Sequence, residues 1–397
     1  MKKWFSAATL IVSVLVTACT FVDGGRNGEN RPGEFIDLSE PDRLDNIRTL
    51  QFEREQVFED SLLLDRIPDI TVDDEGTLYL AGEKWNHRHV HYFLAGGKYL
   101  GILTDRQANK HEFDQISAVQ FRDDQLWIMD SANDSITRYS TDGKTNYEYI
   151  ALDSLISDKF TAGQATNALD FIPLGVDRNE KLLFAFYEQR NPAYQPDGQI
   201  DIALLSISNG AEPEILFQEK ADRYIVGDYA GKPAPFTLPI EEKPFIDFTG
   251  SGKIFSAYST DFLIRVFSAD GTPLRTYRYP VERVDFQPEE DLLPEYSYNR
   301  QLYMVRESAE YPDQWPALYD MFVDDEQNIW VSTVQENREV SEWFVIDDDN
   351  EKSVAARFSW PVDKPIHAVK NGKAYTIEQN SSGFEVVVRY NVTGLAD

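Results

Sequence analysis

The fold is decided by a short unit that is clearest at residues 322–331, which read FVDDEQNIWV. An apolar stretch leads into an acidic turn, and an aliphatic residue followed by an aromatic one then begins a second apolar stretch. Similar units occur at residues 70–80 (ITVDDEGTLYL), 121–128 (FRDDQLWI), 176–184 (VDRNEKLLF), 248–255 (FTGSGKIF) and 369–375 (VKNGKAY). Six copies of one hairpin-like unit indicate a repeat protein.

The apolar residues around each copy alternate with a period of two, in short runs bounded by Gly, Asp and Asn, which is the pattern of β-strands. The anchor residue of the unit occupies positions 79, 127, 183, 255, 330 and 375, so successive copies lie between 45 residues (330 to 375) and 75 residues (255 to 330) apart. The shortest spacings match one four-stranded propeller blade, and the excess predicts inserted loops. We therefore expect an all-β fold, a six-bladed β-propeller with four-stranded blades.

A propeller needs a strand from one terminus to complete the blade of the other, because an open ring would leave a bare sheet edge. Residues 48–54 alternate suitably, and we expect this N-terminal strand to close the ring by pairing beside residues 384–390 in the last blade. The alternative is a seventh blade within residues 145–170 or 276–312.

The repeat and one neighbouring segment resemble a known group of proteins. Residues 311–319 (YPDQWPALY), followed by residues 324–325 and 329–331, are similar to the NHL-like six-bladed β-propellers of bacterial lipoproteins, which are related to TolB-like and lactonase-like propellers. The resemblance extends over about residues 49–395 and implies the fold. It leaves the activity open, since propellers of this kind have unrelated functions.

The N-terminus has the pattern of a bacterial lipoprotein signal. Two lysines precede the mostly apolar run of residues 4–18, which is too short to span a bilayer comfortably. Cys19 is the single cysteine of the chain, and residues 15–19 (LVTAC) resemble the lipobox, whose cysteine is acylated and becomes the mature N-terminus. The alternative is a chance cysteine in a signal region that is cleaved at another site.

These features divide the chain into three predicted parts. Residues 1–18 are the expected signal peptide, residues 19–48 a lipid-anchored flexible tether rich in Gly, Pro and polar residues, and residues 49–397 the propeller. The lipid on Cys19 predicts attachment to the bacterial cell envelope. Thr20 follows it in place of Asp, which by the sorting rule of enteric bacteria favours the outer membrane.

The charge of the chain excludes some partners. The 38 basic and 68 acidic residues give a formal net charge of −30, and no cluster of Lys and Arg is present to favour a nucleic acid or an anionic lipid surface. We therefore expect no nucleic-acid partner, and contact with the membrane through the N-terminal lipid. A single cysteine also excludes disulfides, thiolate zinc sites and iron–sulfur clusters.

Common catalytic signatures are absent from the sequence, which has no GxSxG, HExxH, Walker or GxGxxG motif. His89 and His91 would share one face of a strand and could offer two imidazoles to one metal. No carboxylate accompanies them, so an ordinary strand position is the simpler interpretation. We assign neither a catalytic residue nor a metal site from these patterns.

The resemblance to lactonase-like propellers adds a hypothesis about the channel. In those proteins a divalent cation lies in the central channel, held by polar side chains at the starts of the inner strands. The matching neighbourhoods here contain Asp69, Ser117, Asp247, Asp320 and His367, which could bind a cation such as calcium or act as acid and base. The alternative is that they are ordinary solvated residues of a channel mouth, and we expect no resident cofactor.

The insertion at residues 276–316 gathers aromatic residues, among them Tyr296, Tyr298, Tyr311 and Trp315. Such a loop on a rigid ring suits recognition of a peptide, a sugar or a small apolar ligand, or else it covers the rim of the fourth and fifth blades. We therefore expect a membrane-anchored extracytoplasmic propeller that acts as a binding scaffold for a protein or a small-molecule ligand. The alternative is a lactonase-like hydrolase or lyase with a divalent cation in the central channel.

Overall fold

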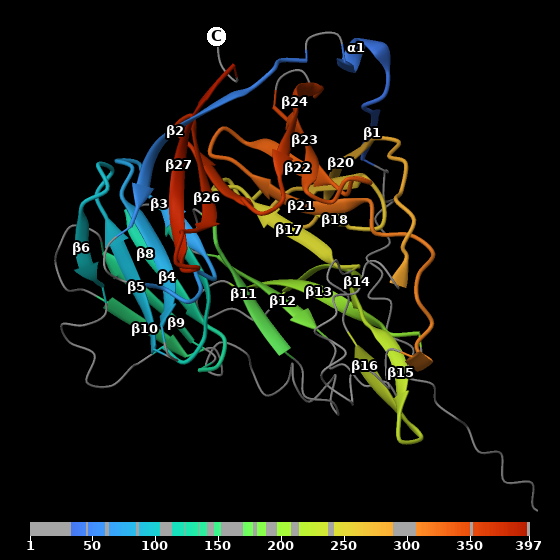
Figure 1. The fold of residues 1–397 in the computed structure, drawn as a ribbon, viewed down its shortest axis with the longest axis horizontal. Coiled ribbons are helices and arrows are strands. Elements are labelled where there is room, and N and C mark those ends of the chain that lie inside the picture. Colours follow the sequence, from blue (N-terminus) through green and yellow to red (C-terminus); the bar gives the residue numbers. More distant parts are fainter. Residues whose placement is uncertain are drawn as a thin grey trace, which may run out of the picture. The chain divides into compact units, whose positions relative to one another are not determined.

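Six antiparallel sheets of four strands make up most of the part of the chain that the computed structural model describes (Figure 1). The described residues are 33–44, 47–59, 63–84, 87–103, 113–122, 124–133, 135–140, 147–151, 170–177, 181–187, 197–207, 214–236, 242–288, 307–349 and 352–394. Contacts within the chain separate Met1–Pro32 from the unit Gly33–Asp397, in which all described strands lie. This unit is a six-bladed β-propeller, as the repeat predicts.

The first three blades follow one another along the chain, and each is an antiparallel meander. Blade I consists of β3 (Ile70–Val72), β4 (Leu78–Lys84), β5 (His87–Phe93) and β6 (Tyr99–Ile102). Blade II consists of β7 (Ile116–Arg122), β8 (Gln125–Asp130), β9 (Ser135–Ser140) and β10 (Tyr147–Ala151). Blade III consists of β11 (Asp170–Val176), β12 (Leu182–Tyr187), β13 (Gln199–Ile207) and β14 (Glu214–Arg223).

The last three blades come from the C-terminal half of the chain, except for two N-terminal strands, one added to blade IV and one in blade VI. Blade IV consists of β17 (Pro244–Phe248), β18 (Ile254–Tyr258), β19 (Leu263–Phe267) and β20 (Pro273–Arg278). Blade V consists of β21 (Leu318–Val323), β22 (Asn328–Thr333), β23 (Val340–Asp347) and β24 (Val354–Pro361). Blade VI consists of β25 (Ile366–Lys370), β26 (Lys373–Gln379), β27 (Glu385–Thr393) and β2 (Gln51–Phe58).

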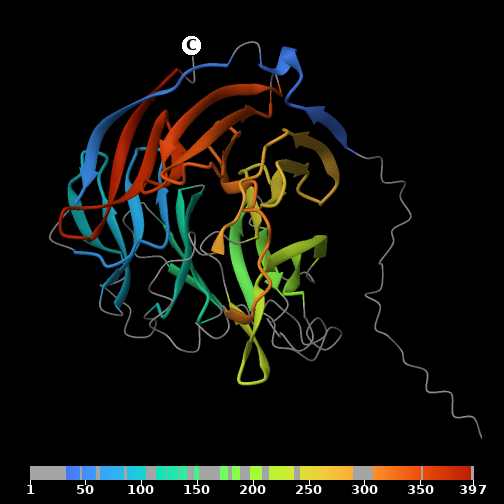
Figure 2. The same ribbon diagram turned by 45° about the vertical axis from the view of Figure 1, so that its right-hand side comes forward.

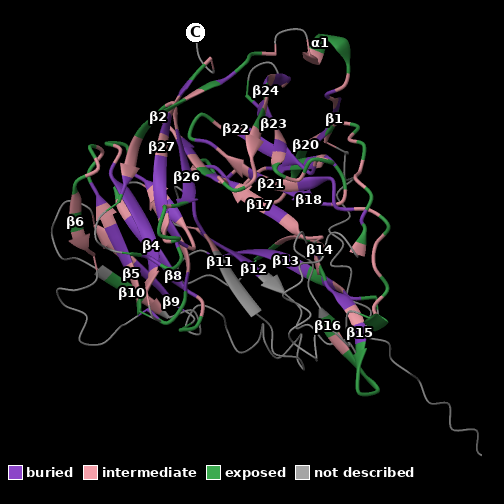
Figure 3. Cartoon of the chain, in the orientation of Figure 1, coloured by how far each residue is buried: buried purple, intermediate pink, exposed green. Residues whose placement is uncertain are grey.

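The first strands of neighbouring blades lie beside one another and surround a channel. Contacts join β3 to β7, β7 to β11, β17 to β21, β21 to β25 and β25 to β3. We call these first strands the inner strands. The second strands are buried along most of their described length, as the purple of β4, β8 and β22 shows in Figure 3. The anchor residues of the six repeats all lie on these second strands: Tyr79, Trp127, Leu183, Phe255, Trp330 and Tyr375.

The acidic turn of the repeat is held by its own first aspartate. One carboxylate oxygen of Asp324 accepts the backbone N–H of Asn328 at 2.7 Å, and the other accepts the indole N–H of Trp330 at 2.8 Å. In blade I, the hydroxyl of Tyr79 donates to Asp73 at 3.4 Å in the same way. In blades I and V the turn aspartate is thus linked to the aromatic residue of the second strand.

The N-terminal strand closes the ring. Strand β2 is the outermost strand of blade VI and pairs with β27 in antiparallel register, with Gln51 opposite Thr393 and Phe58 opposite Val387. Figures 1 and 2 both show this blue strand alongside the red strands of the C-terminus. The predicted closure is confirmed, although the strand begins at Gln51 and continues beyond the predicted segment to Phe58.

Residues 33–44 belong to the propeller unit, which corrects the prediction that residues 19–48 form a tether. Strand β1 (Glu34–Asp37) pairs in parallel with β20 as a fifth strand of blade IV, and the short helix α1 (Pro41–Leu44) follows it. The propeller unit therefore starts at Gly33 and not at residue 49.

Two apolar side chains hold this segment. Ile36 and Leu38, which are 3% and 0% exposed, enter the core that blades IV and V share. They are two residues apart, as on one face of a strand, but two apolar residues are too few to stand out in a polar segment. The predicted signal peptide and Cys19 lie outside the described residues.

A hairpin and the long insertion form a small core of their own. The hairpin pairs β15 (Ile225–Tyr229) with β16 (Lys232–Phe236). Ile225 packs in a cluster with Phe286 and Trp315 from the insertion. The described parts of residues 145–170 and 276–312 supply strands to blades II, III and IV, and no seventh blade is present among the described residues.

Removal of β2 is expected to destabilise the whole propeller. A chain without residues 20–58 exposes the edge of β27 and loses Phe52, whose ring centre lies 4.9 Å from that of Phe358 and 4.6 Å from that of Trp360 in blade V. The truncation also removes β1 with the buried Ile36 and Leu38. Loss of two strands and of these contacts should cost several kcal/mol, so we expect the melting temperature to fall by about 10 °C or more in scanning calorimetry.

The matched control is a chain without residues 20–32, which lie outside the propeller unit. Its melting temperature should stay within about 2 °C of that of the full chain. Equal melting temperatures for the two truncated chains would contradict closure through β2.

Candidate functional site

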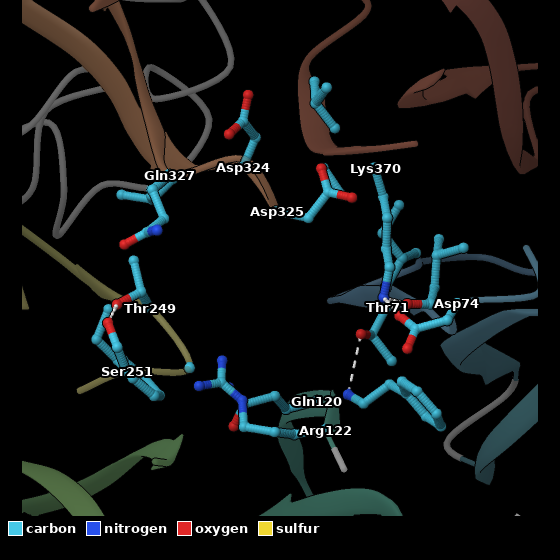
Figure 4. Close-up of a pocket in the computed structure, with 18 residues that line it drawn as sticks. Thr71, Asp74, Gln120, Arg122, Thr249, Ser251, Asp324, Asp325, Gln327 and Lys370 are labelled. Atoms are coloured by element: carbon cyan, nitrogen blue, oxygen red, sulfur yellow. Dashed lines mark hydrogen bonds and ion pairs between the residues drawn. The ribbon is translucent and has the colours of Figure 1, made fainter. Parts of the chain in front are cut away.

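A cavity of about 500 Å³ opens where the inner strands end (Figure 4). Blades I, II, IV, V and VI contribute to its wall. We call it the mouth cavity, and its polar lining residues are Thr71, Asp74, Gln120, Arg122, Thr249, Ser251, Asp324, Asp325, Gln327 and Lys370.

The mouth cavity is built from departures from the repeat. Directly after the last apolar residue of the inner strand, blades I, III and V carry an aspartate, namely Asp73, Asp177 and Asp324. At the same position blades II, IV and VI carry side chains that line the cavity, namely Arg122, Thr249 and Lys370. Three alternate blades thus carry a cationic or hydroxyl side chain at the position where the other three carry the turn aspartate.

Lys370 is bound into the wall of the cavity. Its ammonium group lies 2.6 Å from a carboxylate oxygen of Asp74 and donates to the backbone carbonyl of Val72 at 3.0 Å. It also lies 5.5 Å from the ring centre of Phe121. The charge of Lys370 is therefore balanced by blade I, and the pair ties blade VI to blade I.

Arg122 extends from the end of β7 into the cavity (Figure 4). Its guanidinium carbon lies 5.1 Å from the ring centre of Phe248 in blade IV, so the planar group is supported on an aromatic face. Burial raises the pKa of Asp247 to about 6, and the charge of Arg122 is among the factors that oppose this rise. The guanidinium therefore lies close to the channel carboxylates as well as to the cavity.

The wall opposite Arg122 carries acidic and amide groups from blade V (Figure 4). Asp325 is exposed, and one of its oxygens accepts the backbone N–H of Asn371 at 3.0 Å. Thr249 and Ser251 of blade IV form a hydroxyl pair at 2.8 Å beside them. The cavity thus presents a cation, a carboxylate and neutral hydroxyl groups to one volume.

The first predicted channel residue, Asp69, joins two blades. One carboxylate oxygen accepts the N–H of its neighbour Ile70 and the other accepts the N–H of Val119 in blade II, both at 2.8 Å. Burial raises the pKa of Asp69 to about 7, and the nearby charge of Asp247 also raises it, although both hydrogen bonds favour the ionised form.

Asp247 forms the same kind of link between blades IV and V, and two other side chains repeat it. Its oxygens accept the N–H groups of Phe248 and Val323, each at 2.7 Å. At the equivalent positions, Thr71 accepts the N–H of Phe121 and Gln120 accepts the N–H of Val176, each at 3.0 Å. One position of the inner strand therefore binds the next blade at three junctions of the ring.

The other predicted channel residues are Asp320, Ser117 and His367. Asp320 and Ser117 form hydrogen bonds within their own blades. Asp320 accepts the N–H of Met321 at 2.9 Å, and burial raises its pKa. Ser117 donates to the carbonyl of Met129 at 3.3 Å within blade II. The side chain of His367 is in contact with solvent. The surrounding protein nevertheless removes enough water from the imidazole to lower its pKa to about 4.

The structure brings the three predicted carboxylates to one channel, since the charge of Asp247 acts on Asp69 and the charge of Asp320 acts on Asp247. His367 instead lines a second cavity of about 500 Å³, beside Arg66 and Lys364. The mouth cavity itself was missed by sequence reasoning. The signal that could have revealed it is the replacement of the turn aspartate in alternate repeats.

The rings of His89 and His91 on β5 lie 6.1 Å apart. His91 is buried and its Nδ1 forms a hydrogen bond with the hydroxyl of Tyr99 at 3.1 Å, while burial lowers its pKa to about 4. Within the described ranges, no three His, Cys, Asp or Glu side chains are arranged to hold a metal ion. A divalent cation in the channel stays a prediction.

The predicted aromatic ligand loop is part of a core where the structure describes it. Trp315 is 2% exposed, and the ring of Phe286 meets it edge-on at 4.6 Å. Tyr311 packs against the same cluster. Trp315 therefore has no exposed face for a ligand, which corrects its assignment, and Tyr296 and Tyr298 lie outside the described residues.

Comparisons with known proteins found similar solved structures at low sequence identity. No family model matches the chain, and no curated protein matches it. One similar solved structure is a protein from Bacteroides fragilis that its name describes as exported, with 12% identity, 90% of this chain and 99% of that chain covered, and a TM-score of 0.46. Another is a member of the DUF4221 family from Bacteroides vulgatus, with 9% identity, 87% and 99% covered, and a TM-score of 0.49. A streptogramin B lyase has 11% identity, 87% and 98% covered, and a TM-score of 0.41.

No helix among the described residues is long and apolar enough to cross a bilayer.

The channel carboxylates should make stability fall as pH rises. Because Asp69 and Asp247 have folded pKa values of about 7 and about 6, above the 3.8 of an unperturbed Asp, the folded chain binds more protons than the unfolded chain between about pH 4 and 7. The free energy of unfolding should therefore decrease across this window, by at most about 1.4 kcal/mol per pH unit for each group. Asp69→Asn should reduce that slope in urea denaturation at several pH values.

The control is Glu326→Gln, which removes an exposed acid from the β21–β22 turn. It removes an exposed carboxylate that is not part of the channel, so it shows how much of the slope comes from general repulsion within an acidic chain. An unchanged slope in Asp69→Asn would contradict the proposed role of Asp69 in the pH dependence.

Proposed function

We propose that the chain is an extracytoplasmic propeller, anchored to the bacterial cell envelope by a lipid on Cys19, that binds a small polar ligand in the mouth cavity. The observation that supports this most strongly is the lining of the cavity, in which five blades surround about 500 Å³ with charged, hydroxyl and amide side chains. A concave site of about 300–1,000 Å³ with convergent polar groups on a rigid scaffold is typical of small-molecule binding.

The anchor is proposed from the N-terminal sequence. Lys2 and Lys3 precede an apolar run that ends in LVTAC at residues 15–19, and Cys19 is the only cysteine in 397 residues. Thr20 after the cysteine favours the outer membrane. The propeller unit begins at Gly33, so residues 20–32 are the segment that would connect the lipid to the folded body.

Binding is favoured over catalysis because the channel carboxylates already serve the fold. Both oxygens of Asp69 and both oxygens of Asp247 accept backbone N–H groups, and one N–H of each pair comes from the next blade. These bonds fix each carboxylate in the channel wall and occupy part of its acceptor capacity, which leaves less of it for a cation or a substrate.

A lactonase-like hydrolase or lyase is the second candidate. The observation in its favour is Asp69, whose pKa of about 7 suits proton exchange near neutral pH. It would act beside Asp247 and Asp320 in the channel, where their charges influence one another. Turnover of a lactone that depends on a divalent cation and is lost in Asp247→Asn would favour this candidate over the binding protein.

Cys19→Ser is expected to release the protein from membranes. Without the thiol the lipid cannot be attached, so the variant should appear in the soluble fraction or as an uncleaved precursor, and fractionation with intact-mass measurement distinguishes the two. The control is Ser13→Ala, which changes the apolar run and keeps Cys19. A Cys19→Ser chain that is cleaved normally and still sediments with membranes would contradict the lipoprotein assignment.

Filling the mouth cavity should remove ligand-dependent stabilisation. The purified lipidated chain is screened by thermal unfolding against amino acids, short peptides, sugars, dicarboxylates and phosphate, because a ligand at 100 times its Kd stabilises the folded state by about 2.7 kcal/mol. Ser251→Trp places an indole on the cavity wall and should abolish the shift, whereas Ser381→Trp in the exposed β26–β27 turn should preserve it. No shift with any compound, or a shift that survives Ser251→Trp, would contradict the proposed function.

A further inference from the structure

The second cavity, of about 500 Å³, lies at the other end of the inner strand β25 from the mouth cavity. Lys370 at the end of this strand lines the mouth cavity, whereas His367 near its start lines the second cavity. Residues 66–68, before β3, and residues 363–365, before β25, also line it. The second cavity is therefore built where blade VI meets the segment that leads into blade I.

The backbone around the second cavity is fixed on two sides. Arg66 exchanges backbone hydrogen bonds with β4 of blade I, and Glu385 of blade VI accepts the N–H of Ile67 at 2.5 Å. On the other side, the indole of Trp360 donates to the backbone carbonyl of Lys364 at 2.6 Å. The segments that carry the basic side chains of the cavity are thus held in place by the fold, which lowers the cost of ordering them around a ligand.

The basic side chains of the cavity are not engaged by the fold. Among the described residues, the guanidinium of Arg66, the ammonium group of Lys364 and the imidazole of His367 form no hydrogen bond or ion pair. Burial lowers the pKa of His367 to about 4, so its ring is uncharged near neutral pH and has one N–H to donate. These three donor groups therefore border one volume and are available to a ligand.

The carboxylates of the cavity are used differently. Glu378 accepts the hydroxyl of Tyr390 at 2.7 Å, and Glu385 accepts the N–H of Ile67. Asp363 is exposed, and its charge also acts on the phenol of Tyr390. Three carboxylates that line the same cavity repel a ligand with two negative charges more strongly than a ligand with one.

Four other residues of the lining are apolar. Ile67 and Ile377 are 4% and 7% exposed, and Pro68 and Pro365 line the cavity with them. A ligand with an apolar body gains about 25 cal/mol for each Å² of apolar surface that it buries on such a wall. The second cavity thus combines basic donors with apolar surface.

From this combination we infer that the second cavity binds a small monocarboxylic acid with an apolar body. Its carboxylate accepts charge-assisted hydrogen bonds from Arg66 and Lys364 and a further one from His367, and its body lies against the isoleucines and prolines. The inference goes beyond the proposed function and does not depend on it, because the two cavities share no lining residue.

Phenylacetate and three analogues test the inference by titration calorimetry near neutral pH on the full lipidated chain. Phenylacetamide lacks the negative charge, acetate lacks the apolar body, and phenyl phosphate carries a second negative charge. Phenylacetate should bind, and each analogue should bind at least about tenfold more weakly. Phenylacetate belongs to none of the compound classes that test the mouth cavity.

Two variants assign the carboxylate to its partners. Arg66→Gln and Lys364→Gln each remove one cationic donor, so each should weaken the binding of phenylacetate at least about tenfold. Neither side chain bonds to another described residue, so the melting temperature without ligand should stay within about 2 °C. The matched controls are Arg278→Gln on β20 and Lys98→Gln in blade I, both exposed, and both should keep the wild-type affinity.

The inference is overturned if phenylacetate fails to bind at millimolar concentration, or if phenylacetamide or phenyl phosphate binds as tightly. Wild-type affinity in both Arg66→Gln and Lys364→Gln would also overturn it. Binding that is lost in Ser251→Trp and kept in Arg66→Gln would assign phenylacetate to the mouth cavity, so the inference would be wrong and the proposed function would stand. Binding that depends on Arg66 and Lys364 supports the inference even if no compound binds in the mouth cavity.

Discussion

The structure depends on how the inner strands satisfy their channel-facing edge. Each inner strand has a ladder partner on one side only, so N–H groups on its other side need acceptors, because a buried N–H without a partner is costly. Thr71, Gln120 and Asp247 supply a side-chain oxygen from one blade to a backbone N–H of the next. These bonds join blades that share no sheet, and they make the channel wall a continuous structure.

The same constraint explains the residues that do not fit the pattern. In blade III the equivalent position is Gly175, and a Cβ atom there would overlap the side chains of Gln120 and Phe248. Blades II, III and IV approach one another closely at this position. The space that is left admits only a residue without a side chain. Where the position is an aspartate, as at Asp247, the carboxylate is engaged on both oxygens. The channel residues Thr71, Gln120 and Asp247 therefore serve to hold neighbouring blades together.

Sequence predicted those parts of the structure that depend on local pattern. The six hairpins were recognisable because the two strands and the turn of each lie close together in sequence, and in blades I and V the turn aspartate also bonds to the aromatic residue of the second strand, as Asp324 does to Trp330. The partner of Asp69 was not recognisable, because Val119 is 50 residues away and belongs to another blade. The segment around Ile36 was taken for a tether because its burial depends on the core that blades IV and V share. Trp315 was taken for a ligand contact because sequence does not distinguish an exposed aromatic residue from the anchor of a small core.

The mouth cavity shows why a repeat is informative where it is broken. If the position after each inner strand served the fold alone, all blades could carry the turn aspartate that Asp73 and Asp324 represent. Blades II and VI instead carry Arg122 and Lys370 at turns of two residues, where no such aspartate is needed. A cation at this position adds nothing to the local ladder, but it gives a chain of net charge −30 a positive group at the channel mouth. Lys370 also ties blade VI to blade I through Asp74 and Val72, so a departure from the repeat can replace a bond within one hairpin by a bond between two blades.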